Sequence, residues 1–411
     1  MRYINNTLFL EDISINQLAA EVKTPFYVYS YNKMQSNYLA LQQICTPYKI
    51  DICYSIKANP GLAIIKTFAD LGAGADVVSI GELRRAIKAG IPAEKISFSG
   101  VGKSAGEILE AMTYDVTINI ESESEFNLIK KFIERSNCKV KLTFRLNPDV
   151  QIQNHPKIST GSSSNKFGIL QEDIVRLYEK AYKVNNIHCA GITMHIGSQI
   201  LDYRTFEQAY ANLSALIDEL GNTNLPVEQI SLGGGFGVKY QISDQDFDFV
   251  KWQQLLEKYF KKFTGQITIE PGRYLVAEAG LLITQVRHLK NSKDKVFIVV
   301  DAAMNDMVRP AMYNAYHTII PVDKNPKFSI ITADIVGPVC ESSDTFGFGV
   351  EIPEVIYPGL LAITEVGAYG SSMASFYNCR PILKEVMIKN SEYSIIKDEI
   401  PHEILDQYEH F

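Results

Sequence analysis

The feature that most constrains this chain is an alternation of short β-branched runs with longer amphipathic stretches between residues 50 and 270. Such a rhythm is typical of repeated βα units around a parallel sheet. Eight runs predict strands: 50–56, 74–78, 96–99, 116–120, 140–146, 189–195, 230–232 and 267–269. Seven helical patterns lie between them and another, 31–43, precedes the first. Together they predict a closed (β/α)8 barrel rather than an open sheet.

The pattern changes after residue 270. Further β-type runs there are separated by Gly, Pro, Asn and Asp, which predicts a mostly β domain. The first thirty residues hold two strand-like pieces that we expect to pair into this domain. We therefore predict two domains, an α/β barrel over residues 30–280 and a β domain made of residues 281–411 with residues 1–29.

Composition narrows the class of protein. With 411 residues, 46% of them hydrophobic, the chain can bury two or three cores. The net charge of -7 and the interspersed charges argue against a nucleic-acid partner. The first residues lack the basic patch and apolar stretch of a signal peptide, and no apolar run is long enough to span a bilayer. We expect a soluble, cytoplasmic protein without a membrane partner.

The cysteines form no C-x-x-C pair: Cys45, Cys53, Cys138, Cys189, Cys340 and Cys379. This scatter argues against a zinc site and against a disulfide framework, so we predict no metal centre. We expect reduced thiols, most of them buried as small core residues.

Polar residues recur where the predicted barrel strands end. In barrels of this kind the strand ends and the loops after them meet at one mouth, where the chemistry takes place. The residues concerned are Lys57, Asp76, Arg145, Asn147, His195, Gly233–Gly235 and Glu270–Arg273. A lysine, acids, a histidine, a glycine run and an arginine at one mouth indicate a site for an anionic ligand with a titratable partner.

Each of these features also has a simpler interpretation. Most lysines are solvated, but Lys57 follows a buried strand, and desolvation there would lower its pKa and suit it to Schiff-base formation. The run Gly233–Gly235 could be only a turn and does not fit the dinucleotide fingerprint, although its backbone amides could bind a phosphate. His195, taken alone, is more often a core histidine.

Eleven motifs, in the usual order and spread over nearly the whole chain, resemble those of the diaminopimelate decarboxylases. These enzymes are fold type III pyridoxal-phosphate-dependent decarboxylases with a barrel of the alanine-racemase type. The motifs are YSIKAN (54–59), GADVVSIGEL (74–83), FSGVGK (98–103), HPKISTG (155–161), NKFGI (165–169), HIGSQI (195–200), LGGGFG (232–237), EPGRYLVAEAG (270–280), DAAMNDMVRPAMYNAYH (301–317), VGPVCESSDTFG (336–347) and GAYGSSMASFYN (367–378).

The resemblance implies how the cofactor, pyridoxal 5'-phosphate, is bound. Lys57 resembles the lysine that holds it as an imine, Glu270 the carboxylate that pairs with the pyridine nitrogen, and His195 the residue stacked on the ring. The remaining implied cofactor contacts are Ser198, Gly235, Pro271, Gly272, Arg273 and Tyr369. Polar support near the lysine and ring is implied for Asp76, Glu82 and Arg145.

The resemblance also implies a reaction, the decarboxylation of meso-2,6-diaminopimelate to L-lysine in lysine biosynthesis. The end of the substrate that does not react presents a carboxylate and an ammonium, which suit an arginine and an acid. The implied substrate residues are Arg273, Arg309, Tyr313, Glu341 and Tyr369. Cys340 resembles the residue that returns a proton after carbon dioxide leaves.

Three alternatives share parts of this pattern. Another amino-acid decarboxylase is one alternative, since ornithine and arginine decarboxylases share the barrel motifs, but an ornithine or lysine decarboxylase would have no use for an arginine such as Arg309. An amino-acid racemase shares the lysine-bearing barrel, and a non-catalytic pyridoxal-phosphate carrier resembles a lone barrel. In the diaminopimelate decarboxylases the loop that carries Cys340 comes from the neighbouring subunit, so the resemblance implies a homodimer with shared active sites.

Overall fold

A computed structural model of the chain describes residues 1–136, 138–150, 165–324, 327–355 and 357–410. The motif HPKISTG (155–161) lies outside the described residues. The chain divides into two compact units. The first, here called the β unit, comprises Met1–Ser36, Lys239–Asp244 and Leu275–Phe411, and the second, the barrel unit, comprises Asn37–Val238 and Gln245–Tyr274.

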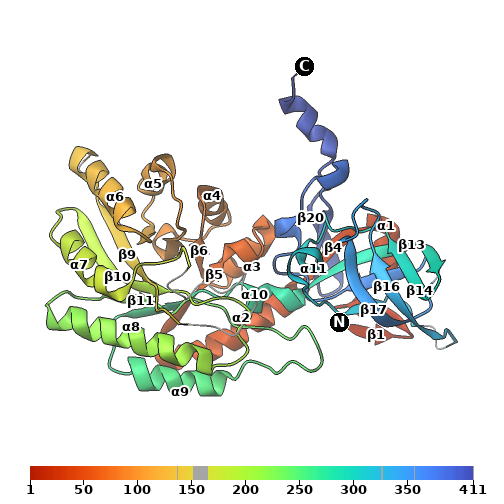
Figure 1. Cartoon of the computed structure of the whole chain (residues 1–411), viewed down its shortest axis with the longest axis horizontal. Coiled ribbons are helices and arrows are strands. Elements are labelled where there is room, and N and C mark those ends of the chain that lie inside the picture. The colour runs from red at the N-terminus through yellow and green to blue at the C-terminus, as the bar shows by residue number, and fades with distance from the viewer. Residues whose placement is uncertain (137, 151–164, 325–326, 356, 411) are drawn as a thin grey trace. The chain divides into compact units, whose positions relative to one another are not determined.

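The barrel unit contains a closed ring of eight parallel strands, in the order β10-β11-β12-β5-β6-β7-β8-β9 (Figure 1). The strands are β5 Ile50–Ser55, β6 Gly74–Val77, β7 Ile96–Phe98, β8 Thr117–Ile120, β9 Val140–Leu146, β10 Ile187–Met194, β11 Gln229–Ser231 and β12 Gln266–Ile269. All eight overlap the predicted strands, so the predicted fold is confirmed.

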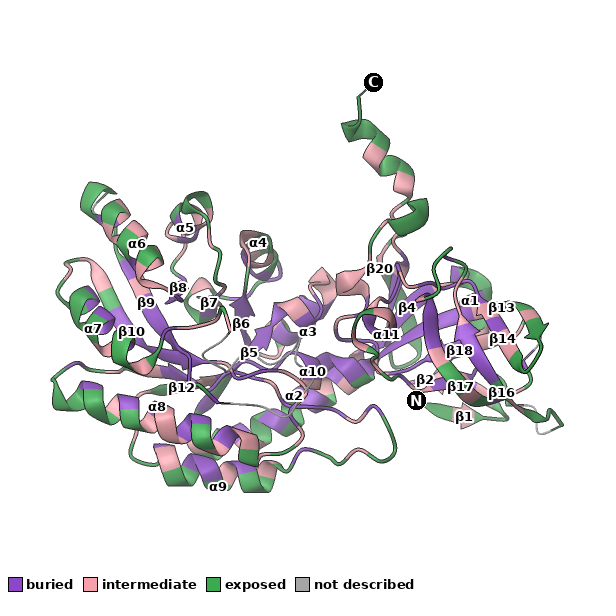
Figure 2. Cartoon of the chain, viewed as in Figure 1, coloured by how far each residue is buried: buried purple, intermediate pink, exposed green. Residues whose placement is uncertain are grey.

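Helices surround this ring, with exposed outer faces and buried strands inside them (Figure 2). They are α2 Tyr31–Cys45, α3 Leu62–Asp70, α4 Ile80–Lys88, α5 Ala105–Ala111, α6 Glu123–Ser136, α7 Gln171–Tyr182, α8 Arg204–Asn222 and α9 Phe249–Phe260. Their starts are set by local chemistry: the Ser104 hydroxyl accepts from the Glu107 amide and the Glu107 carboxylate accepts from the Ser104 amide, a capping box at α5. In α8 the buried residues recur at helical spacing, from Phe206 to Leu220.

The β unit is built on a nine-stranded mixed sheet and a separate three-stranded sheet. The larger sheet consists of β4 Phe26–Ser30, β13 Gly280–Ser292, β14 Lys295–Val300, β15 Ile319–Pro321, β16 Ile330–Val336, β17 Thr345–Pro353, β18 Leu360–Ile363, β19 Lys384–Lys389 and β20 Glu392–Lys397. The smaller consists of β1 Arg2–Ile4, β2 Thr7–Leu10 and β3 Ile13–Ser14.

The amino-terminal segment belongs to the β unit through pairing and packing. Strand β4 pairs antiparallel with β13 and parallel with β19, as expected for one of the early strand-like pieces. Helix α1, Ile15–Val22, packs with β2 and β4 against β13 and β19. Residues of this core include Leu8, Ile15, Leu18, Val28, Ile283 and Val386. Burial of this shared apolar surface holds the first thirty residues to strands that lie far along the chain.

The cysteines correct one expectation. All six thiols are free, and only Cys45, Cys53 and Cys189 are buried. The prediction that most are core residues is wrong, because Cys138 and Cys340 lie on connections between elements, Cys379 ends a short 3-10 turn, and all three are exposed.

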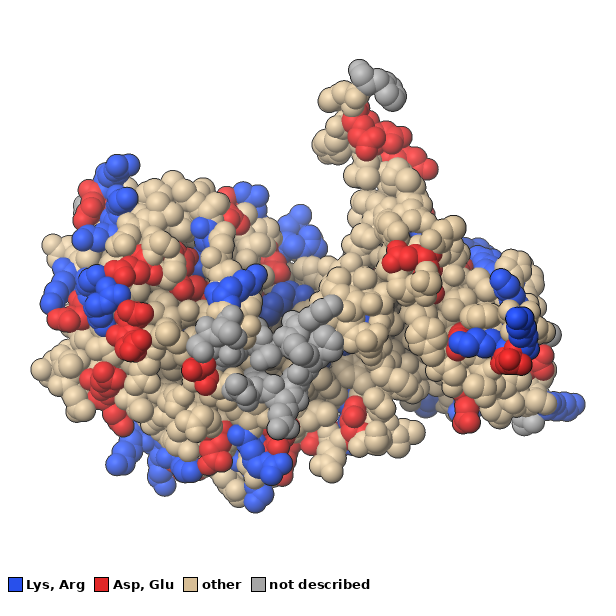
Figure 3. Space-filling view, in the orientation of Figure 1, with Lys and Arg blue, Asp and Glu red and all other residues tan. Residues whose placement is uncertain are grey.

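On the face shown in Figure 3, basic and acidic side chains are interspersed. Within the described ranges, none of the helices is both long and apolar enough to cross a membrane.

Candidate active site

The carboxyl ends of the barrel strands surround a cavity of about 420 Å³. Five side chains predicted from strand ends line it: Lys57, Asp76, Arg145, His195 and Glu270. They come from β5, β6, β9, β10 and β12 or the residues directly after these strands. The closed parallel ring brings them together because every strand ends at the same mouth.

Lys57 lies in a single 3-10 turn, Ile56–Ala58, directly after β5. Its Nζ is 3.0 Å from Asp76 Oδ2, which also accepts a hydrogen bond of 2.7 Å from the Ser55 hydroxyl. Burial disfavours ionisation of Asp76, but the Lys57 ammonium and these hydrogen bonds outweigh it and hold the pKa of Asp76 at about 2. An ionised carboxylate therefore positions the Lys57 amine.

His195 directly follows β10, and its ring is a neutral imidazole. Burial, followed by the positive charges of Lys57 and Arg145, lowers its pKa to about 3. The Gly234 amide lies 3.3 Å from His195 Nδ1. Because an amide N–H can only donate, Nδ1 accepts and the ring proton is on Nε2. A neutral ring in this position suits stacking on an aromatic ligand.

Glu270 directly follows β12 and is buried. Burial and the negative charge of Asp76 raise its pKa to about 7, although the Ser231 hydrogen bond and the charges of Lys57 and Arg145 act in the opposite direction. The Ser231 hydroxyl donates to Glu270 Oε1 over 2.6 Å and accepts from the Gly233 amide over 3.2 Å. Sequence reasoning did not single out Ser231. It could have been found as the polar last residue of β11, just before the glycine run.

The glycine run after β11 lies where side chains do not fit. A Cβ on Gly234 would be 2.0 Å from the Glu270 carbonyl oxygen. On Gly235, at φ +99°, a Cβ would be 2.4 Å from the Gly197 carbonyl oxygen. These glycines let the loops after β10, β11 and β12 approach each other closely, which makes a backbone-lined cradle.

Ser198 and Arg273 lie together in these loops. The Arg273 guanidinium donates to the Ser198 hydroxyl from Nε over 3.3 Å and from Nη2 over 3.1 Å. Gly272 lies beside the lysine turn, since its Cβ would be 3.0 Å from Ala58 Cβ. Pro271 links Glu270 to this segment, and its carbonyl accepts from the Ser55 amide.

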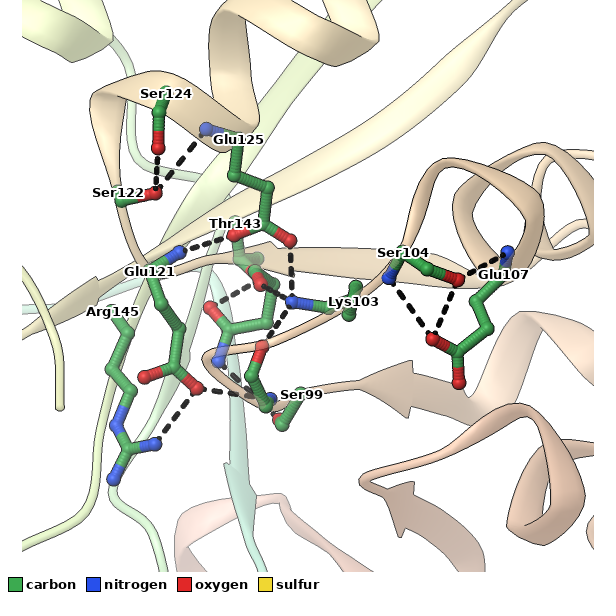
Figure 4. A network of polar contacts seen from close by, with 12 residues as sticks. Ser99, Lys103, Ser104, Glu107, Glu121, Ser122, Ser124, Glu125, Thr143 and Arg145 are labelled. Atoms are coloured by element: carbon green, nitrogen blue, oxygen red, sulfur yellow. Dashed lines mark hydrogen bonds and ion pairs between the residues drawn. The ribbon is translucent and has the colours of Figure 1, made fainter. Parts of the chain in front are cut away.

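Arg145 and Glu82 differ in their relation to the cavity. Arg145 lines it and pairs with Glu121, which sequence reasoning did not single out (Figure 4). Glu82 is outside the cavity lining; its carboxylate accepts from the Val78 amide over 2.8 Å, next to the Ser79 cap of α4. The charges of Asp76 and Lys57 both act on the pKa of Glu82, so its implied polar support near the lysine stays a prediction, beside its hydrogen bond at the start of α4.

Arg309 is buried in the β unit at the start of helix α11, Arg309–Tyr313. Its Nε donates to His317 Nε2 over 3.3 Å, and its guanidinium carbon is 5.3 Å from the centre of the Tyr240 ring. His317 Nδ1 is 2.9 Å from the Thr364 carbonyl oxygen, so Nδ1 carries the proton and Nε2 accepts. Tyr313 ends the same helix.

Cys340 and Glu341 lie on an exposed connection between β16 and β17. Glu341 accepts from the Ser343 hydroxyl over 2.5 Å and from the Tyr377 hydroxyl over 2.8 Å. These hydrogen bonds lower its pKa and keep the carboxylate ionised. Tyr369 is partly buried, with φ +57°, in the segment after β18.

Pyridoxal phosphate fits the barrel cavity. The cavity offers an amine at Lys57, a buried carboxylate at Glu270 and a neutral ring at His195. The closely approaching glycine loops after β11 and β12, where a Cβ would meet neighbouring backbone, supply backbone groups without side chains. These are the partners that its aldehyde, pyridine nitrogen, ring face and phosphate need.

Comparisons with known proteins show what the chain is similar to. The family described as "Pyridoxal-dependent decarboxylase, pyridoxal binding domain" matches residues 32–277. The diaminopimelate decarboxylase of Aquifex aeolicus is 39% identical over 398 residues, 97% of this chain and 94% of that protein. That of Neisseria meningitidis serogroup A is 41% identical, with 95% of this chain and 96% of that protein covered. A crystal structure of diaminopimelate decarboxylase from Helicobacter pylori complexed with L-lysine superposes with a TM-score of 0.92 at 38% identity, covering 96% of this chain and 98% of that one.

Proposed function

The chain belongs to the diaminopimelate decarboxylases, a family of pyridoxal-phosphate-dependent enzymes, and we propose that the barrel cavity is where it converts meso-2,6-diaminopimelate to L-lysine and carbon dioxide. The observation that carries this proposal is the set of Lys57, Asp76, His195 and Glu270 around one cavity. Full-length relatives of the same activity favour this reaction over that of another amino-acid decarboxylase, a racemase or a carrier.

The cofactor, when bound, supplies an electron sink for the carbanion that decarboxylation leaves. Lys57 would hold it covalently, with Asp76 orienting the amine. Glu270 would pair with the pyridine nitrogen, and the neutral ring of His195 would stack on the cofactor ring. The cradle of Gly235, Pro271 and Gly272, with Ser198, Arg273 and Tyr369, would bind the phosphate.

Five residues would recognise the substrate: Arg273, Arg309, Tyr313, Glu341 and Tyr369. A planar guanidinium can hold a carboxylate through two hydrogen bonds, which suits Arg309 to the end of the substrate that does not react. The ionised Glu341 suits the ammonium at that end. Cys340, the neighbour of Glu341, would return a proton after carbon dioxide leaves.

We further propose that the enzyme is a cytoplasmic homodimer in which Cys340 and Glu341 of one subunit complete the cavity of the other. The family resemblance supports this arrangement, and so does the exposed position of Cys340. A thiol that serves a partner's site must be accessible in the isolated chain.

Product analysis tests the function. The purified protein with pyridoxal phosphate should release carbon dioxide and L-lysine from meso-diaminopimelate in equal amounts, and Lys57→Ala should abolish both products and the visible absorption of the lysine-bound cofactor. Formation of cadaverine from lysine, with no reaction of diaminopimelate, would contradict the proposal.

A further inference from the structure

Two motifs singled out in the sequence, FSGVGK (98–103) and NKFGI (165–169), have no role in the site described so far. Both lie against Arg145 and Glu121 at the mouth of the barrel. Figure 4 shows two residues of FSGVGK, Ser99 and Lys103, in this region. Glu121 directly follows β8 and is buried, and Arg145 lies near the end of β9. These two charged residues connect both motifs to the cavity.

The Glu121 carboxylate accepts three hydrogen bonds from three different segments. Its Oε1 accepts from Arg145 Nη1 over 2.9 Å and from the Gly100 amide over 2.9 Å. Its Oε2 accepts from the Gly168 amide over 3.2 Å. One side chain thus joins the loop after β7, the end of β9 and the NKFGI segment.

The NKFGI segment also holds Arg145 directly. The Phe167 ring lies under the guanidinium, with 4.9 Å between its centre and Arg145 Cζ. The Ile169 amide donates to the Arg145 carbonyl oxygen over 2.8 Å, and the Asn147 amide donates to the Ile169 carbonyl oxygen over 2.9 Å. Three contacts therefore fix Arg145. Glu121 accepts a hydrogen bond from its guanidinium, the Phe167 ring packs on the guanidinium face, and Ile169 hydrogen-bonds its backbone carbonyl.

A second buried ion pair lies beside the first without reaching Arg145. Lys103 Nζ donates to Glu125 Oε1 over 2.6 Å and to the carbonyl oxygens of Gly100 and Asn119 over 2.7 and 2.9 Å. Its side chain is 1% exposed. Gly100 is held at its carbonyl by Lys103 and at its amide by Glu121, and Glu125 Oε2 accepts from the Glu121 backbone amide over 2.9 Å. The two pairs are therefore joined through the backbone, but only the Glu121 carboxylate contacts the Arg145 side chain.

The charge of Arg145 acts on the groups that would face the cofactor. Its guanidinium lines the cavity together with Lys57, His195 and Glu270. It disfavours protonation of His195 and favours ionisation of Glu270. A buried ion pair contributes little net stability because desolvation offsets its attraction, so stability alone does not explain Glu121 and Arg145.

We propose that Glu121, with Phe167, is a positioning residue that fixes the Arg145 guanidinium in the cofactor cavity and thereby strengthens cofactor binding. The inference rests on the proposed use of this cavity for pyridoxal phosphate. It gives the FSGVGK and NKFGI motifs a common role, since both supply backbone amides to the carboxylate that holds Arg145.

The test compares Glu121→Gln with Glu125→Gln. Each removes a buried carboxylate from an ion pair in the same region, but only Glu121 contacts Arg145. We expect similar losses of thermal stability in the two apo proteins. The dissociation constant of pyridoxal phosphate, measured by fluorescence titration of the apo protein, should rise by about 10-fold to 100-fold in Glu121→Gln only, the size of effect seen for residues that orient metal ligands.

An Arg145→Met background tests whether Glu121 acts through Arg145. There, Glu121→Gln should leave the cofactor dissociation constant unchanged, because the residue it positions is gone. Should Glu121→Gln fail to fold, Phe167→Leu, which keeps both charges, should weaken cofactor binding in the same direction.

Equal cofactor affinities in Glu121→Gln and Glu125→Gln, or a full additive effect in the Arg145→Met background, would overturn the inference. Where Glu121→Gln does not fold, normal cofactor affinity in Phe167→Leu would overturn it too. Wild-type cofactor binding and lysine formation, measured in parallel, keep these results separate from a failure of the proposed function.

Discussion

A short hydrogen bond from Ser231 favours the ionised form of Glu270. The folded protein raises the pKa of Glu270 to about 7, chiefly by burial, and the Ser231 hydroxyl opposes this rise because it stabilises the carboxylate. Ser231→Ala should therefore raise the pKa of Glu270 further, by about one pH unit or more, since a hydrogen bond to a charged group contributes about 1.5–3 kcal/mol. Infrared titration of the protonated carboxyl band in the apo protein measures this pKa.

Ser97→Ala is the matched control for this prediction. Ser97 lies in barrel strand β7, which pairs with neither β11 nor β12, and its hydroxyl has no hydrogen-bond partner among the described residues. Removal of that hydroxyl should leave the Glu270 titration unchanged. A Ser231→Ala protein that titrates like the wild type would show that burial alone sets the pKa of Glu270.

Arg309 is the residue at which substrate specificity can be tested most directly. Its side chain is held by His317 and the Tyr240 ring within the β unit. If it binds the distal carboxylate, Arg309→Ala should reduce kcat/KM for meso-diaminopimelate by the equivalent of about 2–5 kcal/mol, the usual cost of removing one partner of a buried charge pair. Steady-state kinetics and a cofactor titration should show lost turnover with normal cofactor binding.

Arg2→Ala supplies the control for Arg309→Ala. Arg2 also belongs to the β unit, but its ion pair with Asp12 is exposed on both sides. An exposed pair contributes about 0–1 kcal/mol, so turnover should stay at the wild-type level. Unchanged kinetics in Arg309→Ala would remove this arginine from the substrate site.

At the scale of elements, the barrel depends on the close approach of the loops after β11 and β12. Gly234→Ala places a Cβ 2.0 Å from the Glu270 carbonyl oxygen, so the two loops must separate. We expect a loss of about 1–3 kcal/mol in the free energy of unfolding, the usual cost of overpacking, together with weaker cofactor binding. Denaturant unfolding of the apo and holo proteins measures both effects.

Gly106→Ala tests whether the effect depends on position. Gly106 lies inside helix α5, and a Cβ there meets no atom within 4 Å. This substitution should stabilise the protein by about 0.4–1 kcal/mol, because alanine restricts the unfolded chain. Equal stability changes at the two positions would contradict the close packing inferred for the loop.

At the scale of the whole molecule, the proposed dimer predicts complementation. Lys57→Ala and Cys340→Ala proteins should each be nearly inactive. A mixed dimer has one site in which both residues are intact if Lys57 and Cys340 of the same chain serve different sites. After subunit exchange, activity should return in part, and native mass spectrometry should show the mixed dimer. A mixture that exchanges and stays inactive would place Cys340 in the site of its own chain.

The sequence alone determined the barrel fold and most of the residues at the carboxyl ends of its strands. Strand and helix periodicity are local properties, so all eight barrel strands could be predicted. Because parallel strands of a closed barrel end at one mouth, Lys57, Asp76, His195 and Glu270 could be placed together before any coordinates were known. The motif resemblance added the cofactor and the reaction.

Only the tertiary structure decided which side chains hold these residues in place. Ser231 and Glu270 are 39 residues apart in the chain, and Glu121 and Arg145 are 24 apart. Such partners are chosen by the register between neighbouring strands and by the path of the loops, which no local pattern specifies. The same reason explains why the sequence did not show that the Glu82 carboxylate accepts a hydrogen bond from the Val78 amide beside the start of α4. A carboxylate accepts hydrogen bonds only from donors close to it. The path of the folded backbone determines which donors are close.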